Sequence, residues 1–558
     1  MVSMFFCSRL LLPLGPIPNI VPSLSPNQLF PAYFEHGRLE YAEKCYQTSI
    51  DSKTKHNVVA LNNLLLLHLS QGNFVKAASC GIEMRQILDI NGEESATLCT
   101  LAIIEAYTCQ WVNRSKTFER VVAGKSSGTV QPFHSEFIPQ ISPQMTLSIS
   151  NMFSGRFRQR ALHNRSNVGS LYKHNLSTPD SRVRIGYVSS CFGNTATTFL
   201  SNKIFELHNR EKFQVFCFDL AGSDGSSEWK AVRESADVFL DVSRPDHSID
   251  VANEINEHCI DILVDLDGFV VGSMPEIFTL RPAPIQITMS CGTTGSESGI
   301  DYLVGDKFTI PEHHRSYFSE KIIYVPNIMT SYSRDLGLDV DRHKMRKRWG
   351  VSNNAFVYAC FSQPYKMDPE LFVVWMEILR EVPNSSLVLL RYSLAMEKNL
   401  RREAAKHNIV GDQIVFWDLV PRHEHLERCC LVDTYLDTVV CSGIATGCDA
   451  LWSGAPLITL AGDRICNRVG ASLVSSAGLE EFIALNLVEY KELAVAMSAE
   501  NNRIDILHLL DDARENSPLF DSLQWVQSFE SALDVALDRC RQDLEPEHII
   551  IPTIDERK

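Results

Sequence analysis

The stretch CSGIATGCDALWSGAPLITLAG, residues 441 to 462, joins a turn of small residues to the start of an apolar helical segment. Gly443, Ala445, Thr446 and Gly447 form the turn. Backbone N–H groups at a helix start gather positive potential, so the turn is a candidate seat for an anion, with phosphate the obvious guest. The ordinary alternative is that Thr446 caps the helix and Asp449 favours its first turn. Taken alone, the stretch favours that alternative.

Short apolar segments that alternate with helical segments predict the elements that hold this turn. A first series, from 181 to about 335, contains RVRIGYVSS, FQVFCFDL, DILVDLDG and IQITMS. A second series, ending near 480, contains AFVYACFS, SSLVLLRY, QIVFWDLV, TYLDTVV and PLITLAG. Strands this apolar usually lie in parallel sheets covered by helices, and doubly wound sheets bind ligands at the carboxyl ends of their strands. The sequence therefore predicts two α/β units with a cleft between them, and the turn lies at one strand end.

Composition narrows the classes of function. The chain has 558 residues, of which 45% are hydrophobic, enough for several domains with buried cores. A formal net charge of −16 argues against a general nucleic-acid binder, which normally shows a basic face or tail. None of the 16 cysteines is spaced C-x-x-C, so we expect reduced, buried thiols and no disulfide frame or zinc site. This pattern indicates the cytosol or nucleus.

The N-terminal part of the chain lacks the alternation of apolar and helical segments and contains two other features. Residues 1–27 resemble a signal sequence only superficially, because Arg9 interrupts the apolar run and prolines follow soon after. No other uncharged apolar run is long enough to span a bilayer, so we expect a soluble chain. GRLEYAEKCYQTSI at Gly37 and GNFVKAASCGIEMRQIL at Gly72 then repeat at an offset of 35 residues. This resembles the tetratricopeptide repeat, a possible groove for extended peptide, although an ordinary helical hairpin domain fits nearly as well.

A series of ordered motifs carries a family resemblance over most of the chain. The motifs are RIGYVSSCFGN, LRPAPIQ, SQPYKMDP, VPNSSLVLLR, YLDTVVCSGIATGCDALWSGAPLITLAG, NRVGAS and SPLFD. Together they resemble a divergent protein O-GlcNAc transferase, a GT-B glycosyltransferase with tetratricopeptide repeats ahead of two Rossmann-like halves. The large insert that some animal members carry between the halves is absent, since Tyr324 to Gln363 is only a short bridge.

The resemblance implies a UDP-GlcNAc donor, no metal cofactor, and protein or peptide acceptors. Lys366 matches the family lysine that contacts the diphosphate and is the leading catalytic candidate. The other matched donor-site positions are Gln363 beside it, His425 at the nucleotide, Arg422 where the family often has lysine, Asp449 at the ribose, and Ala445 and Thr446 at the family's threonine pair. Without the resemblance, Lys366 would read as a solvated lysine and His425 as one of two histidines on a polar helix.

The chain also departs from the family pattern. Family histidines are replaced by Thr195, Phe199, Asn256 and Ile444, a family lysine is replaced by Val271, and the loop after RPAPIQ is rewritten as TMSCGTTGSESG. None of the residues that replace the histidines titrates near neutrality, so acid/base roles of those histidines do not transfer. The donor half therefore matches better than the acceptor half.

Three hypotheses follow. The first is an active, inverting transferase that moves N-acetylglucosamine from UDP-GlcNAc to Ser or Thr of nucleocytoplasmic proteins. The second is a related transferase with another donor, as in the plant SPINDLY branch that uses GDP-fucose. The third is a catalytically weakened pseudoenzyme that binds nucleotide or peptide as a scaffold. The family reading favours the first, and we expect neither nucleic acid nor membrane as a partner.

The predicted division of the chain follows from these observations. It comprises an irregular segment (1–27), tetratricopeptide-like helices (28–112), a polar connector (113–180), the first Rossmann-like half (181–335), the second half with the nucleotide-sugar site (336–545), and a tail (546–558).

Overall fold

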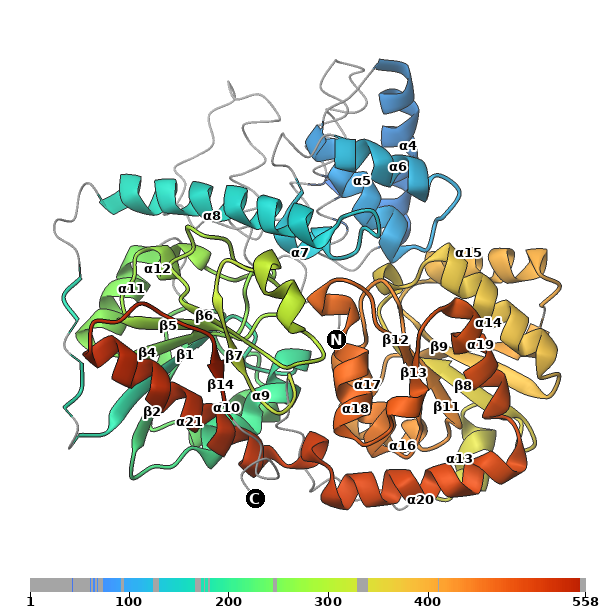
Figure 1. The fold of residues 1–558 in the computed structure, drawn as a ribbon. Helices are drawn as coiled ribbons and strands as arrows, with labels where there is room; N and C mark the ends of the chain where they lie inside the picture. Colours follow the sequence, from blue (N-terminus) through green and yellow to red (C-terminus); the bar gives the residue numbers. More distant parts are fainter. Residues whose placement is uncertain are drawn as a thin grey trace.

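The computed structural model of the chain describes residues 74–91, 95–123, 130–165, 172–174, 176–178, 181–243, 248–328, 340–409 and 411–551, with five single residues between 43 and 68. Two parallel sheets stand side by side, and a helical region lies over them (Figure 1). The predicted segment 1–27 and the first repeat at Gly37 lie outside these residues, apart from Glu43. No described helix is long and apolar enough to cross a membrane.

The first sheet has eight strands in the order β14-β7-β6-β5-β4-β1-β2-β3. Every neighbouring pair is parallel. The strands are β1 (Val183–Ser189), β2 (Phe213–Asp219), β3 (Val238–Asp241), β4 (Ile262–Asp265), β5 (Ile285–Thr288), β6 (Tyr302–Gly305), β7 (Lys321–Tyr324) and β14 (Ile549–Ile550). Its helices are α9 (Ala196–Leu207), α10 (Ser227–Ser235), α11 (Ser248–Glu257), α12 (Pro275–Thr279) and α21 (Ser522–Arg541).

The second sheet has six parallel strands in the order β10-β9-β8-β11-β12-β13. They are β8 (Phe356–Cys360), β9 (Ser385–Arg391), β10 (Ile414–Asp418), β11 (Thr434–Leu436), β12 (Leu457–Leu460) and β13 (Ile483–Ala484). The helices are α13 (Arg342–Arg348), α14 (Pro369–Glu381), α15 (Leu394–Lys406), α16 (Arg422–Cys429), α17 (Ile444–Trp452), α18 (Val469–Ser476), α19 (Leu487–Ala496) and α20 (Glu500–Asn516). The chain thus starts in the middle of the sheet and reverses direction between β8 and β11, which is the doubly wound order. The predicted parallel α/β architecture is confirmed.

The helical region differs from the sequence prediction. The repeat that begins at Gly72 forms α4 (Phe74–Asn91), which packs against α5 (Ser95–Tyr107) as a helical pair. Residues 113–180 were expected to be a connector with little periodicity, yet they contain α6 (Arg114–Ala123), α7 (Pro132–Ser135) and α8 (Pro143–Arg165). Helix α8 lies across the first unit (Figure 1) and buries Ser150 and Ser154 there. A helix that buries small polar side chains such as these has no continuous apolar stripe, so its sequence pattern did not predict α8.

The C-terminal part of the chain returns to the first unit. After α20 crosses the second unit, α21 packs on the first sheet and β14 pairs with β7 (Figure 1). Trp525, Val526, Phe529 and Leu533 of α21 share one buried core with β1, β2 and β4. The second unit therefore ends before residue 522, and part of the predicted tail is a strand of the first unit.

The two units also contact each other directly. Leu200 and Leu303 of the first unit belong to the same buried cluster as the core of the second. Arg468 Nε donates to Phe308 O at 2.7 Å, and Ser472 Oγ donates to Asp306 Oδ2 at 2.6 Å. These contacts fix the relative position of the facing strand ends.

The returning helix yields a stability prediction. Trp525 is 1% exposed and its Nε1 donates to Asn327 O at 2.9 Å, so Trp525→Ala leaves both a cavity and an unpaired carbonyl. We expect a loss of about 3–5 kcal/mol in the free energy of unfolding, measured by guanidinium titration with circular dichroism. Leu523→Ala on the same helix, where the side chain is 50% exposed, is the control and should change little. Equal midpoints for the two variants would contradict the assignment of α21 to the first core.

Candidate active site

The switch point of the second sheet brings two predicted segments together. β8 and β11 are neighbours in the sheet, and the connections from their carboxyl ends run to opposite sides, which opens a crevice in doubly wound folds. The short helix η4 (Pro364–Lys366) follows β8, and the turn at 437–443 follows β11 and leads into α17. The two segments meet where Lys366 Nζ donates to Ser442 O, three residues before Ala445.

A buried carboxylate holds the turn after β11. Asp437 is 1% exposed, and its Oδ1 accepts hydrogen bonds from Gly443 N and Thr438 N at 2.8 Å. Its Oδ2 accepts a hydrogen bond from Thr459 Oγ1 at 2.8 Å. Burial raises the pKa of Asp437 above its ordinary value even though these donors oppose the shift. No motif pointed to Asp437. The sequence shows only that an acidic residue directly follows a buried strand.

The first turn of α17 is the predicted anion seat. Gly443 is its N-cap and no side chain caps the helix, so the alternative that Thr446 is the cap is wrong. Ile444, Ala445 and Thr446 are half-buried in this first turn. Within the described part of the chain, no group accepts a hydrogen bond from the backbone N–H groups of these three residues. The positive end of the helix is thus available to an anionic group.

Lys366 lies beside that helix end. Its Nζ donates to Ser442 O at 2.6 Å, one residue before the N-cap. Burial works against the charge of Lys366, but the acidic groups around it, with Cys441, Tyr365 and Asp437 foremost, outweigh burial and raise its pKa above the ordinary value. The amine is therefore a cation at neutral pH. A lysine cation and a helix N-terminus at one point form a strong anion site.

Residues from the helical region hold the loop that carries Lys366. The Tyr365 ring centroid lies 4.0 Å from that of Phe137 and 4.9 Å from that of Tyr107. Arg114 Nη1 donates to Met367 O at 2.6 Å. No sequence motif predicted that these residues hold the loop, because the contacts form only when the helical region packs on the second unit.

The predicted ribose residue, Asp449, forms an ionic group with Arg422 and His425. Arg422 Nη2 donates to Asp449 Oδ1 at 2.8 Å and Arg422 Nη1 to Asp449 Oδ2 at 3.2 Å, a two-point pair. His425 Nε2 lies 3.7 Å from Asp449 Oδ2, and its Nδ1 accepts from Arg428 Nε at 3.2 Å. Burial lowers the pKa of His425 to about 4, so the ring is neutral and directs Nε2–H toward Asp449. Arg428, which fixes this tautomer, was also missed.

The positions that depart from the family pattern have structural partners. Thr195 caps α9 by accepting from Thr198 N at 3.2 Å and donates to Cys191 O at 2.6 Å. Asn256 donates to Lys173 O at 3.2 Å and to Pro282 O at 3.0 Å. Helix α11 ends just before β4 begins, so Asn256 lies at the amino end of the sheet, away from the crevice. Phe199 instead faces the second unit, with Arg422 Cζ 4.2 Å from its ring centroid.

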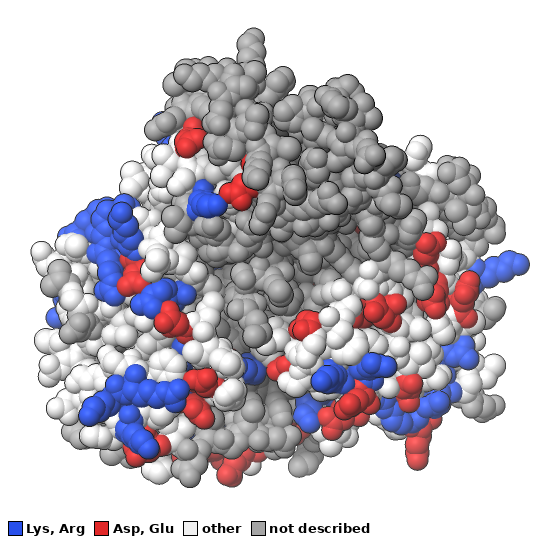
Figure 2. Space-filling view, turned by 180° about the vertical axis from the view of Figure 1, so that it is seen from behind, with Lys and Arg blue, Asp and Glu red and all other residues white. Residues whose placement is uncertain are grey.

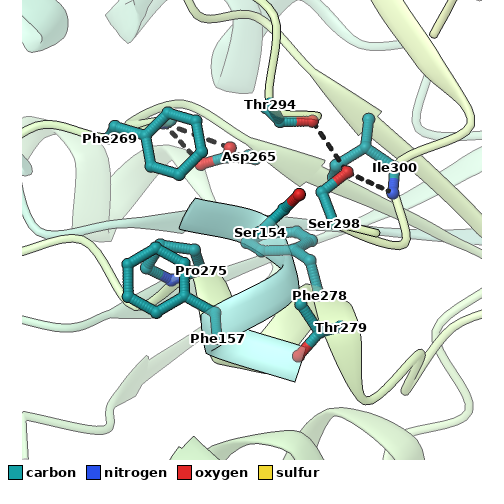
Figure 3. A pocket seen from close by; sticks show the side chains of 11 residues that line it. Ser154, Phe157, Asp265, Phe269, Pro275, Phe278, Thr279, Thr294, Ser298 and Ile300 are labelled. Atoms are coloured by element: carbon teal, nitrogen blue, oxygen red, sulfur yellow. Dashed lines mark hydrogen bonds between the residues drawn. The ribbon is translucent and has the colours of Figure 1, made fainter. Parts of the chain in front are cut away.

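The DLD sequence at 265–267 ends β4, as expected. Asp265 accepts from Gly268 N and Thr288 Oγ1, and it lines a small cavity below Phe269 (Figure 3). Burial, together with the charge of Asp267, raises the pKa of Asp265 to about 7. Asp267 accepts from Ser189 and Ser190. Both carboxylates are thus used within the first unit. Among the described residues, no group of three or more His, Cys, Asp or Glu could hold a metal ion.

Comparisons with known proteins give matches over most of the chain. The sequence profile of Glycosyl transferase family 41 matches residues 119–333 and 340–529. The chain is 37% identical over 446 residues to the probable UDP-N-acetylglucosamine–peptide N-acetylglucosaminyltransferase SEC of Arabidopsis thaliana, covering 76% of this chain and 45% of the relative. It is 26% identical over 480 residues to the UDP-N-acetylglucosamine–peptide N-acetylglucosaminyltransferase of Caenorhabditis elegans, covering 66% of this chain and 42% of the relative. The chain thus spans less than half the length of these relatives.

A solved structure shares the fold. The structure of a Thermobaculum terrenum O-GlcNAc transferase mutant superposes with a TM-score of 0.73 at 21% identity, covering 92% of this chain and 96% of that one. The likeness shows the two-unit GT-B arrangement. The profile match begins at residue 119, within α6, so it includes Phe137 but neither Tyr107 nor Arg114, the other two residues that hold the Lys366 loop.

The turn after β11 provides a prediction. A Cβ at Gly443 would lie 2.5 Å from Thr446 Oγ1 and 2.7 Å from Ser362 Oγ, too close for either hydroxyl. We expect Gly443→Ala to lower the free energy of unfolding by about 1–3 kcal/mol, measured by denaturant titration. Gly155→Ala is the matched control, because a Cβ there meets nothing within 4 Å and alanine favours the helix by about 0.5–1 kcal/mol. Equal stability of the two variants would refute the close packing at Gly443.

Proposed function

We propose that this chain, which belongs to glycosyl transferase family 41, moves N-acetylglucosamine from UDP-GlcNAc to Ser and Thr hydroxyl groups of proteins. One observation carries the proposal: the Lys366 amine lies beside the uncapped N-terminus of α17 at the switch point of the second sheet. The curated relatives that the chain matches are named for this donor and for peptide acceptors.

The proposed reaction is a direct displacement with inversion. The acceptor hydroxyl oxygen bonds to the anomeric carbon and loses its proton, while the bond from that carbon to the diphosphate oxygen breaks. Negative charge then grows on the departing UDP. Preorganised groups that stabilise developing charge are the largest catalytic contribution in many enzymes. Lys366 and the N–H groups of Ala445 and Thr446 are the groups that serve this role.

The roles proposed for the other donor-site residues follow from where they lie relative to Lys366 and α17. Gln363 lies at the start of η4, next to the proposed diphosphate. Asp449 is the proposed partner of the ribose hydroxyls, with Arg422 and His425 around it. No metal is needed in this scheme, because the lysine cation and the helix N-terminus offset the diphosphate charge.

Proposed acceptors are proteins or peptides of the cytosol and nucleus. Every cysteine that the structure describes is a free thiol, which fits a reducing compartment. Nucleic acid is not a proposed partner: basic and acidic side chains lie next to each other over much of the face in Figure 2. On α15, for example, Arg401 pairs with Glu397 and Lys406 with Glu403.

Two other functions have support. A scaffold that binds nucleotide or peptide without turnover is favoured by the altered first unit, where Thr195 and Asn256 serve only local structure. A transferase with another nucleotide sugar, such as GDP-fucose, is the second alternative. SEC and SPINDLY of Arabidopsis thaliana, 37% and 26% identical to this chain, are both named as probable UDP-N-acetylglucosamine–peptide N-acetylglucosaminyltransferases, which supports the first donor.

A donor panel tests the function. The full chain is incubated with a mixed protein acceptor and radiolabelled UDP-GlcNAc, UDP-GalNAc or GDP-fucose, with and without EDTA. We expect label transfer from UDP-GlcNAc alone, unchanged by EDTA. Transfer only from GDP-fucose would overturn the donor, and no transfer from any donor would favour the scaffold. Loss of transfer in EDTA would refute the metal-free scheme.

Replacement of Lys366 tests the mechanism. Lys366→Met should lower single-turnover transfer about 100- to 1,000-fold, with a much smaller effect on UDP-GlcNAc affinity, because the amine acts mainly on charge that develops in the transition state. Lys398→Met, at an exposed lysine of α15, is the control and should transfer normally. Melting temperatures of both variants identify any loss of fold. Normal turnover in a folded Lys366→Met protein would remove the catalytic assignment.

A further inference from the structure

Arg422 contacts both units at once. Within the second unit, its guanidinium makes the two-point pair with Asp449. On its other side lies the Phe199 ring of α9 in the first unit, with Arg422 Cζ 4.2 Å from the ring centroid. An arginine over an aromatic face at this distance forms a cation–π contact.

The elements around this contact keep it in place. Helix α9 also contributes Leu200 to the buried cluster of the second unit, and α9 packs against α17, which carries Asp449. Thr195 caps the first turn of α9 and fixes its start. Phe199 is therefore presented to Arg422 by a capped helix that is already buried against the second unit.

Access to Asp449 depends on Arg422. The Asp449 side chain is 3% exposed and the Arg422 side chain 19% exposed. Both carboxylate oxygens of Asp449 accept from the guanidinium. A ribose diol, with two adjacent hydroxyl donors, needs these same oxygens. Because the Asp449 side chain is almost fully buried and both of its oxygens already face the guanidinium, we expect the diol to compete with Arg422 for them.

We propose that Arg422 is a latch between the two units, held by Asp449 on one side and Phe199 on the other, and that the ribose diol of the donor nucleotide displaces it. This inference rests on the proposed UDP site. Donor binding then opens a contact between the units, and by linkage any change that weakens the latch strengthens nucleotide binding. Phe199 sets donor affinity without touching the donor.

The contact itself is tested without any ligand. Melting temperatures are measured for the full-length chain, Phe199→Ala, Arg422→Gln and the double variant. Because the two side chains interact, the double variant should lose about 1–2 °C less than the sum of the single losses. Additive losses would show that the side chains do not interact and would overturn the latch.

The competition is tested by calorimetry with UDP. Phe199→Ala should bind UDP about two- to tenfold more tightly than the unmodified chain, since the aromatic hold on Arg422 is lost. Phe199→Tyr keeps the ring and should bind with unchanged affinity. Arg468→Gln removes the bond to Phe308 O, another contact between the units, and should not tighten UDP binding. Equal tightening by Arg468→Gln would show general loosening and overturn the specific latch.

The sign of the change separates the remaining explanations. Weaker or unchanged UDP binding in Phe199→Ala, with the coupled melting temperatures intact, would overturn the competition and indicate that the ring contacts the nucleotide or is irrelevant to it. If neither the unmodified chain nor any folded variant binds UDP, the proposed donor site fails and the competition fails with it. The melting-temperature cycle still decides, in that case, whether Arg422 joins the units.

Discussion

The geometry of the candidate site depends on one buried carboxylate, Asp437 at the end of β11. It binds the backbone N–H groups of Thr438 and Gly443 and the Thr459 hydroxyl, so the turn can take only one path into α17. A Cβ at Gly470 of α18 would lie 2.2 Å from Asp437 Oδ2, which shows how closely the next helix covers the carboxylate. Unsatisfied, such a buried acid would be costly, and with its partners in place it fixes where the helix end points. The Ser442 carbonyl that receives Lys366 belongs to this same turn.

The helical region contacts the candidate site through the loop that carries Lys366. Tyr365 packs between Phe137 and Tyr107, and Arg114 binds the backbone two residues before α14 begins. Buried aromatic rings lose little entropy on ordering and hold a loop rigidly. The amine is therefore positioned from two sides, by the turn after β11 and by helices that precede both α/β units. Separating these helices from the two units would release the Lys366 loop.

Most of the strands could be predicted from the sequence because the central strands are apolar on both faces. All nine predicted segments are strands, among them β1, β8 and β9, and all pairs are parallel. The misses have physical causes. β3 is only partly buried, and β13 and β14 have two residues each, so none of these three carries a strong pattern. The four-residue strands β6 and β7 were also missed. The return of α21 and β14 to the first sheet is a long-range choice of partner, which local periodicity does not encode.

The candidate site divides in the same way. The sheet rule predicted that the turn after β11 lies at a strand end, and the resemblance alone singled out Lys366, which in the structure donates to Ser442 O of that turn. Which side chains then bind one another was not predictable, because Arg422, Asp449 and His425 have several possible partners in a crevice. The neutral state of His425 depends on burial and on Arg428, neither of which the motif reveals. Phe199 and Arg422, two positions where the chain departs from its family's pattern, contact each other. A phenylalanine at position 199 puts an aromatic face, which does not titrate, against the second unit's arginine, so the two departures meet at one contact between the halves.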